Sequence, residues 1–216
     1  MKQEISASYR DWLEAQEMPN GKRSAMLSAL ELFAKQGFDG TSTMAIAKNA
    51  GISQATIFKY FKTKDDLLEA ILKPMIDHLL PEYREDFLSD IPAATSLRDE
   101  IHFLVRNRYE FLKKNKEVAL IFLTQVMTNA NTRSMFQDFM TETAPLFIDY
   151  IYKTLKRSGS LRADLAPAAV LRTIAGQLLS YFIQQQVLLP DAKFDEDADL
   201  QMIEDLIVRA LSKDSK

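Results

Sequence analysis

The sequence predicts an all-α fold, in which a small N-terminal group of helices is joined to a larger C-terminal helical bundle. Through most of the 216 residues, apolar side chains recur at the 3.6-residue spacing of amphipathic helices. Apolar alternation with the turn signals of β-hairpins is absent. The chain has six glycines, and three of them, Gly37, Gly40 and Gly51, fall within fifteen residues. Sharp turns are therefore expected mainly in one short region.

The first strongly amphipathic helix is predicted over residues 21–36, and Gly37 is placed to end it. A second, short helix begins near Ser42 or Thr43, either of which can cap its amino end, and it ends at Gly51. The apolar faces of these two helices consist of Met26, Leu27, Leu30, Phe33, Ala34, Ile46, Ala47 and Ala50.

A third helix is predicted after Ser53, which serves as its N-cap. Thr63 is followed three residues later by Asp66, a spacing typical of a capping box at the start of a fourth helix. Pro74 should kink or interrupt this fourth helix, because proline has no N–H to donate. The apolar residues of the two helices are Ile57, Phe61, Leu67, Leu68, Ile71 and Leu72.

The rest of the chain shows helical periodicity in five segments, over about residues 97–113, 117–129, 134–157, 167–189 and 198–212. Pro145 lies inside the third segment, where a proline is unexpected. No internal repeat and no Ser/Gly-rich linker separates the two parts of the chain. We therefore expect the fourth helix to join them rigidly.

Composition excludes several classes of protein. Hydrophobic residues make up 47% and charged residues 26% of the chain, as in globular proteins. The absence of cysteine removes disulfides, thiolate metal sites and thiol nucleophiles, and favours a reducing compartment. The first residues, MKQEISASYRDWLEAQE, lack the apolar region of a signal peptide, and no apolar run is long enough to cross a membrane. We expect a cytoplasmic protein with no membrane partner.

Charge is distributed unevenly. The whole chain has a net charge of −3, which by itself disfavours nucleic acid as a partner. Residues 20–64, however, carry seven basic and two acidic side chains, a net charge of +5, whereas residues 65–216 carry 18 basic and 24 acidic, a net charge of −6. A basic module joined to an acidic body is what a phosphate backbone attracts, although a solvated lysine face is the alternative.

Residues 42–61 have the spacing of a helix-turn-helix. Ala47 is small at the point where the two helices cross, and Gly51 can adopt the left-handed conformation that the turn requires. Ile57, six residues further on, fills the crossing from the second helix. The side chains left outward on that helix are Ser53, Gln54, Ala55, Thr56 and Lys59. Short and amide side chains of this kind suit the amino end of a recognition helix in the major groove of DNA.

Two residues indicate how DNA would be held. Gln54 is the best base reader, because its amide can pair bidentately with adenine N6 and N7, whereas hydroxyl groups at this end bind phosphates more naturally. Lys64 lies in the first turn of its helix, where a cation opposes the positive end of the helix dipole. A DNA phosphate would offset this conflict. Alternatively, Asp65 and Asp66 offset the charge in solvent.

A longer pattern runs through Ala29…Phe33…Gly37-Phe38, Thr43…Ile46-Ala47, Ala50-Gly51-Ile52-Ser53, Thr56-Ile57-Phe58, Phe61 and Lys64…Leu67. Together these residues make positions 22–71 resemble the DNA-binding domain of the TetR/AcrR family of bacterial transcription regulators. The resemblance implies a TetR-like fold, an obligate dimer, a helical body with a ligand cavity, and repression that a ligand relieves.

The resemblance also implies which residues contact DNA. Phosphate contacts are implied for Thr43, Thr56, Tyr60 and Lys64, and base-facing positions for Met44, Ser53, Gln54, Ala55 and Lys59. Phe58 stands where the family often has tyrosine, so one phosphate-directed hydroxyl is missing, and Tyr60 supplies another. Met44 stands where some members read guanine with arginine, which implies little base readout from that helix.

The sequence is therefore divided into an N-terminal extension (1–20), a helix-turn-helix DNA-binding domain (21–66) and a helical ligand-binding and dimerisation domain (67–216). Expected partners are a palindromic double-stranded operator, a small and largely apolar effector, and a second copy of the chain. The second copy is expected to pair through about 167–189 and 198–212. The apolar residues that favour this pairing, with packing inside one chain as the alternative, are Ile174, Leu178, Tyr181, Phe182, Ile203, Leu206 and Ile207.

The body of the chain offers only weak ligand-binding candidates, and side chains of these types are more often ordinary core or surface residues. These candidates are Phe103, Asn107, Phe122, Gln125 and Gln177. No cofactor is expected and no metal site, since the two histidines are 24 residues apart. Neither a Gly-rich phosphate loop nor a nucleophile elbow is present.

The predicted function is therefore a dimeric, sequence-specific DNA-binding transcription regulator, expected to be a ligand-released repressor, and not an enzyme. Two other classes stay open. A helical interaction or adaptor protein would lack salt-dependent binding to duplex DNA. A helical enzyme or carrier would show turnover or transport without affinity for DNA.

Overall fold

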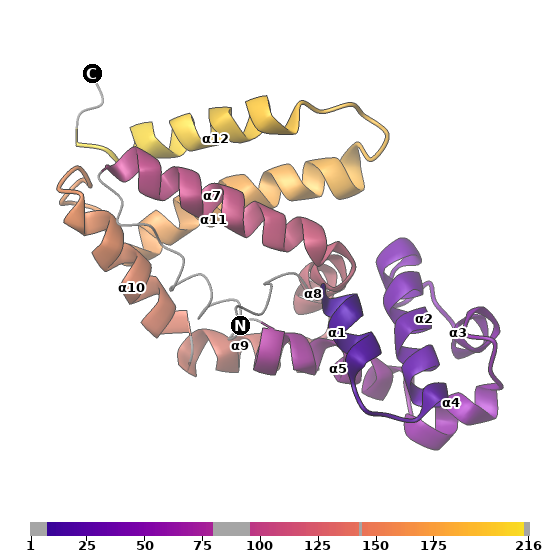
Figure 1. The fold of residues 1–216 in the computed structure, drawn as a ribbon. Helices are drawn as coiled ribbons and strands as arrows, with labels where there is room; N and C mark the ends of the chain where they lie inside the picture. The colour runs from indigo at the N-terminus through magenta and orange to yellow at the C-terminus, as the bar shows by residue number, and fades with distance from the viewer. Residues whose placement is uncertain (1–7, 80–95, 143, 214–216) are drawn as a thin grey trace. The chain divides into compact units, whose positions relative to one another are not determined.

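The computed structural model describes residues 8–79, 96–142 and 144–213 (Figure 1). Within these ranges the chain is helical apart from turns and one isolated β-bridge between Leu161 and Ser212, so the all-α prediction is confirmed. The chain forms two compact units. The first comprises Met1–Glu85 and Lys114–Met140, and the second comprises Asp86–Lys113 and Thr141–Lys216.

The first unit is built around one long helix. Its elements are α1 (Tyr9–Ala15), α2 (Asn20–Gln36), α3 (Thr43–Asn49), α4 (Gln54–Tyr60), α5 (Lys64–Pro74), the π-helix η1 (Met75–Leu79), α8 (Lys116–Thr128) and most of α9 (Ala130–Glu142). Helix α2 contacts α1, α3, α4, α5 and α8. Its buried residues include Met26, Leu30 and Phe33, as the sequence pattern predicts. The predicted DNA-binding domain therefore shares a hydrophobic core with α8.

The predicted N-caps are confirmed for three helices. The side chains of Ser42 and Ser53 each accept a backbone N–H from three residues further on, at 3.1 Å. Thr63 and Asp66 form a reciprocal capping box at the start of α5. These caps satisfy amide groups that have no partner inside the helix, and so they fix where α3, α4 and α5 begin.

The turn between α3 and α4 has the predicted form. Gly51 adopts a left-handed φ of 66°. The N–H of Ile52 donates to the carbonyl of Ala47 at 3.0 Å, and that of Gly51 donates to Lys48 at 3.3 Å. This pair of hydrogen bonds is the Schellman motif, which ends a helix at a left-handed residue. Ile57 is fully buried at the crossing, as expected.

Helix α1 lies in the N-terminal extension, for which no helix is predicted. The backbone N–H of Tyr9 donates to Asn115 Oδ1 at 2.7 Å, and the Tyr9 hydroxyl donates to the carbonyl of Ile71 at 2.6 Å. Burial raises the pKa of the Tyr9 hydroxyl well above its usual value. Arg10 forms a 2.8 Å ion pair with Glu117. Helix α1 therefore binds both α5 and the start of α8.

Two prolines lie at helix boundaries, one at the end of a helix and the other at the start. Helix α5 ends at Pro74 and continues as η1, which confirms the predicted interruption, because proline cannot donate the next helical hydrogen bond. The single helix predicted over 134–157 is wrong: α9 ends at Glu142, and α10 (Ala144–Arg157) is a separate helix. Pro145 is the second residue of α10, where a missing N–H costs nothing.

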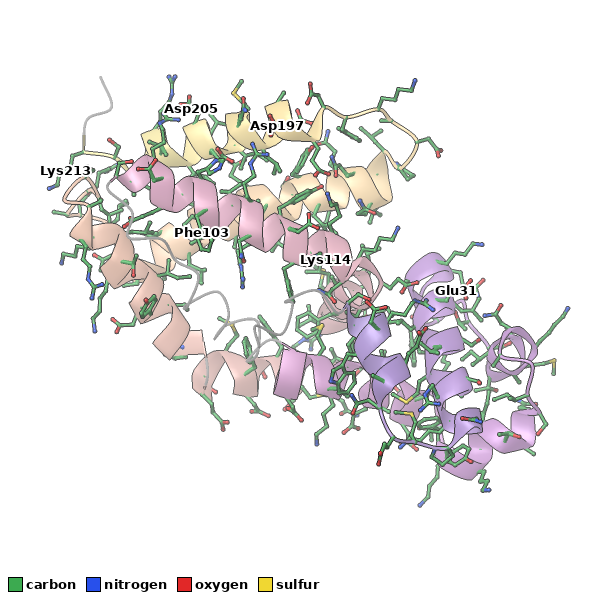
Figure 2. The ribbon with its side chains drawn as sticks, viewed as in Figure 1. Glu31, Phe103, Lys114, Asp197, Asp205 and Lys213 are labelled. Carbon is green, nitrogen blue, oxygen red and sulfur yellow. The ribbon has the colours of Figure 1, made fainter. Side chains whose placement is uncertain are left out.

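The second unit consists of α7 (Leu97–Lys114), α10, α11 (Pro167–Ile183), the π-helix η2 (Gln184–Leu188) and α12 (Glu196–Leu211). The helix predicted over 167–189 therefore changes to π geometry at Gln184. Ion pairs join α7 to α12: Arg106 Nε donates to the buried Glu204 at 2.7 Å, and Arg98 donates at 2.8 Å to Asp205, which Figure 2 labels.

Most of the apolar residues predicted at a dimer interface are already used inside one chain. Ile174, Leu178, Tyr181, Phe182, Ile203 and Ile207 are buried, and of the predicted set only Leu206 is exposed. The exposed apolar surface of this unit instead includes Met202 and Leu206 on α12, together with Val187 and Leu188 in η2 and Leu189 directly after it. In the described part of the chain, no helix is long and apolar enough to cross a bilayer.

Candidate nucleic-acid interface

Helices α2, α3 and α4 meet at one end of the first unit (Figure 1). A polar contact that sequence reasoning missed helps to hold α3 on α2. Ser28 donates to the carbonyl of Ile46 at 2.9 Å. Asn49 Nδ2 donates to Ser28 Oγ at 3.1 Å and, at 3.3 Å, to Glu31, which Figure 2 labels. The sequence signal for this contact is Ser28 itself, a serine inside the apolar face of α2. Such a residue needs a partner when it is buried.

The structure leaves all nine predicted DNA-contact residues with some access to solvent, and all of them belong to the first unit. Met44, Ser53, Ala55 and Lys59 are exposed, and the exposed fraction of Met44 is 67%. The half-buried ones are Thr43, Gln54, Thr56, Tyr60 and Lys64. The outward face of α4 is thus free to meet a partner, as a recognition helix must be.

Gln54 connects the two helices of the motif. Its Nε2 donates to Thr43 Oγ1 at 2.8 Å, so the predicted base reader on α4 touches the predicted phosphate contact on α3. A glutamine amide has two N–H donors and one carbonyl acceptor, and this contact uses one donor. The contact fixes the orientation of the amide while leaving groups that can pair with a base edge.

The amino end of α4 is similarly ordered before any partner binds. The hydroxyls of Ser53 and Thr56 are hydrogen-bonded to each other at 2.8 Å, and Ser53 also accepts the Thr56 N–H. Lys59 lies over the ring of Tyr60, with its Nζ 5.5 Å from the ring centroid. The side chains along this face are therefore held in place mainly by one another.

Lys64 has internal partners that the sequence did not indicate. Its ammonium donates to the carbonyls of Phe38 at 2.8 Å and Thr41 at 3.1 Å, and it lies 4.1 Å from the centroid of the Phe38 ring. These carbonyls offset the unfavourable position of the cation at the helix amino end. An ammonium has three N–H donors, so one is left for an external acceptor.

The basic charges around this surface lack acidic partners. None of the seven Lys and Arg side chains of residues 20–64 forms an ion pair with an acidic side chain that the structure describes. In the second unit, by contrast, Arg98, Arg106 and Lys113 are all paired with carboxylates. Lys35, Lys48, Lys59 and Lys62 are exposed. The positive charge of residues 20–64 is therefore available to phosphates.

The weak ligand-binding candidates lie in both units. Phe122 and Gln125 are on α8 in the first unit, where Phe122 contacts the ring of Phe136 and Gln125 is buried. Those of the second unit are Phe103, Asn107 and Gln177. Gln177 is exposed, and the side chain of Asn107 accepts hydrogen bonds from Arg108. Among the described residues, no group of three or more His, Cys, Asp or Glu side chains could hold a metal ion.

Comparison with known proteins agrees with this geometry. Residues 26–71 match the family model of bacterial regulatory proteins, tetR family. The HTH-type transcriptional repressor KstR2 of Rhodococcus jostii is 28% identical over 149 residues, which are 68% of this chain and 71% of that relative.

Two solved structures share the fold over most of the chain. The ketosteroid transcriptional regulator KstR2 of Mycobacterium tuberculosis has a TM-score of 0.66 and 17% identity, and the match covers 89% of this chain and 95% of that one. The regulator FadR of Bacillus subtilis, solved with stearoyl-CoA, has a TM-score of 0.63 and 20% identity, over 87% and 98% of the two chains. At these identities the likeness concerns the fold.

Proposed function

This chain belongs to the TetR family of transcriptional regulators, and from that premise we propose that it is a dimeric repressor. It binds a palindromic operator in the cytoplasm, and a small, largely apolar molecule releases it. In this proposal residues 21–66 read DNA, whereas residues 67–216 bind the effector and the second copy of the chain.

The observation that carries the proposal is the contrast in charge pairing. In the first unit the basic side chains of residues 20–64 lack acidic partners among the described residues, and α4 has an ordered, outward-facing side. Lys and Arg side chains that bind phosphates release the counterions condensed on DNA, which supplies essentially all of the non-specific affinity for DNA and a large share of the specific affinity. An adaptor protein has no need for such an arrangement.

Within this surface we assign two roles. Gln54 reads a base edge, with Met44, Ser53, Ala55 and Lys59 around it, and Thr43, Thr56, Tyr60 and Lys64 hold phosphates. The contact between Gln54 and Thr43 supports the assignment, because it joins the reading and holding residues at a single crossing of α3 and α4.

The effector is proposed to be apolar by analogy with two of the similar solved structures, whereas a third, from Saccharomonospora viridis, was solved with choline. One structural relative was solved with stearoyl-CoA, and another is named a ketosteroid regulator. Met and Phe side chains make adaptable walls for such molecules. The second copy is proposed to cover the exposed apolar residues of η2 and α12, of which Met202 is 61% and Leu206 is 47% exposed.

The direct test is to select fragments of the source genome that the purified chain retains, and then to titrate salt on a selected duplex and on a scrambled one. We expect tight binding to the selected duplex only, with affinity falling steeply as salt rises. Equal, weak binding to both duplexes would instead favour the adaptor.

The effector is tested on the same duplex. Stearoyl-CoA and a ketosteroid are added separately to the complex at fixed salt, with coenzyme A alone as the control for the headgroup. We expect at least one apolar compound to lower the operator affinity, while coenzyme A does not. Retention of the complex with both compounds would contradict an effector of these apolar classes.

A further inference from the structure

Gly21, near the amino end of α2, lies unusually close to α4. A Cβ atom added at Gly21 would lie 2.8 Å from Thr56 Cγ2 and 3.5 Å from Tyr60 Cε2. Carbon atoms that are not bonded to each other make optimal contact at about 3.5–4.0 Å, so the first of these distances is a clash. Helix α4 can therefore sit at its observed position on α2 because residue 21 has no side chain.

Thr56 cannot move aside freely. Its Oγ1 is hydrogen-bonded to Ser53 Oγ at 2.8 Å, and its backbone N–H is bound by the same serine. A threonine is stiff at χ1, because two heavy atoms branch from its Cβ. Rotating the methyl group away from α2 would therefore break the bond between the two hydroxyls.

The amino end of α2 is also held. Arg23, one turn into the helix, donates from Nη2 to the carbonyl of Gln16 at 2.5 Å and from Nη1 to Asn20 Oδ1 at 3.2 Å. Ala25 and Met26, which follow, are buried in the core of the first unit. A side chain at position 21 would thus meet resistance from both helices.

We propose that Gly21 is a positioning residue, which sets the position of α4 against α2 and thereby orients Thr56 and Tyr60 towards DNA. The proposal rests on the proposed function, in which these two residues hold phosphates. Position 21 lies outside residues 26–71, the part that the family model matches. The close approach is a property of this chain's own first helical turn of α2.

The clash between a Cβ atom at position 21 and Thr56 can be relieved in two ways, and both disturb DNA binding. Either Thr56 rotates, which re-aims its hydroxyl, or α4 shifts as a body, which displaces every contact on its outward face. Without the clash, alanine would favour the helix over glycine. Helix propensity alone predicts that Gly21→Ala stabilises the fold. Because of the close contact, we expect it to destabilise the fold instead.

The test combines Gly21→Ala, Thr56→Ser and the double variant, each measured by fluorescence anisotropy on a selected operator duplex at fixed salt. Thr56→Ser removes the clashing methyl group and keeps the hydroxyl. We expect Gly21→Ala to weaken operator binding about tenfold in the wild-type background and to have no further effect in the Thr56→Ser background, so that the double variant matches Thr56→Ser.

The melting temperatures of the four proteins, measured without DNA, separate this proposal from the proposed function. Gly21→Ala should lower the melting temperature, and Thr56→Ser should restore it in the double variant. Gly176→Ala is the control for the added carbon, since a Cβ at that helical glycine has nothing within 4 Å, and it should not lower the melting temperature.

Each outcome is decisive. Rescue by Thr56→Ser in both measurements supports the proposal, and if Gly21→Ala fails to fold, recovery of folding in the double variant supports it as well. A Gly21→Ala protein that binds and melts like the wild type overturns it, and so does a double variant as impaired as Gly21→Ala. If the wild type binds no duplex, the proposed function fails, and the melting temperatures still decide the role of Gly21.

Discussion

The ammonium of Lys64 serves the fold as well as the proposed DNA contact. It joins the start of α5 to the loop between α2 and α3, through two carbonyls and the ring of Phe38. Hydrogen bonds from a charged donor to buried acceptors are stronger than neutral ones. A role in folding and a role in holding phosphate are compatible, because the two carbonyls use two of three donors.

We predict that Lys64→Ala lowers the free energy of unfolding by about 1–2 kcal/mol, because the Phe38 and Thr41 carbonyls lose their charged donor. It should also weaken specific and non-specific DNA binding alike. Lys62→Ala is the control, since Lys62 is exposed and close in sequence. Urea unfolding measures the first effect, and an unchanged midpoint for Lys64→Ala would contradict the structural role.

Glu100 on α7 is buried, and its Oε2 has no hydrogen-bond partner among the described residues. Burial raises the pKa of this carboxyl from 4.5 to about 7; Arg157 opposes the change and Asp99 adds to it. Between these two pH values the folded state binds more protons than the unfolded state. The free energy of unfolding should therefore fall as pH rises from 4.5 to about 7.

We predict that Glu100→Gln removes this pH-dependent loss. The variant should be more stable than the wild type at pH 8, by on the order of 1 kcal/mol, and the difference should shrink towards pH 5. Chemical unfolding at a series of pH values measures it. A difference between the two proteins that is constant across pH would show that Glu100 titrates normally.

At the level of residues, the sequence predicts contacts that are local. The caps by Ser42, Ser53 and Thr63 join residues three apart, so a sequence pattern contains both partners. The partners of Lys64 and Gln54 are 26 and 11 residues away, and they depend on how the helices cross. The clash at Gly21 has the same origin and could not be read from spacing.

At the level of elements, α1 connects α5 to the start of α8 within the first unit. Its Tyr9 reaches the carbonyl of Ile71 on α5 and the side chain of Asn115 at the start of α8. The Ile71 carbonyl lies just before the point where α5 changes to π geometry at Pro74. The hydroxyl thus supplies a hydrogen bond where regular helical pairing is about to end.

We predict that Tyr9→Phe lowers the free energy of unfolding by about 1 kcal/mol, because it keeps the buried ring and removes the donor to Ile71. Arg10→Gln, which removes the partly exposed pair with Glu117, should cost less than about 1 kcal/mol. Urea unfolding compares the two variants. A larger loss for Arg10→Gln than for Tyr9→Phe would contradict this ranking.

The element that the sequence predicts best is α5, which has an apolar period, the Thr63–Asp66 capping box at its start and Pro74 at its end. Helix α1 escapes prediction because it is short and its pairing with α8 crosses about a hundred residues. The break between α9 and α10 escapes because the periodicity continues across it. The π-helices η1 and η2 follow α-helices without any change of apolar pattern.

At the level of the whole molecule, the proposed dimer should be visible in its mass. Static light scattering at micromolar concentration should report about twice the 24.6 kDa of one chain, as a stable interface requires. Leu206→Asp should shift the protein towards the monomer, because it places a charge in the proposed apolar interface. Met44→Asp, the same kind of change on α3, should leave the mass unchanged. A monomeric wild type would contradict the proposed assembly.

The central claim is that the outward face of α4 reads sequence, and Gln54 tests it most directly. Salt titrations are run on the selected operator and on a scrambled duplex, with the wild type and with Gln54→Ala. Relative to the wild type, we predict that Gln54→Ala loses about 1–3 kcal/mol of binding free energy on the operator and binds the scrambled duplex with almost unchanged affinity. On each duplex, the salt dependence of the affinity should be the same for the two proteins. Equal losses on the two duplexes, or none on either, would contradict base reading by α4.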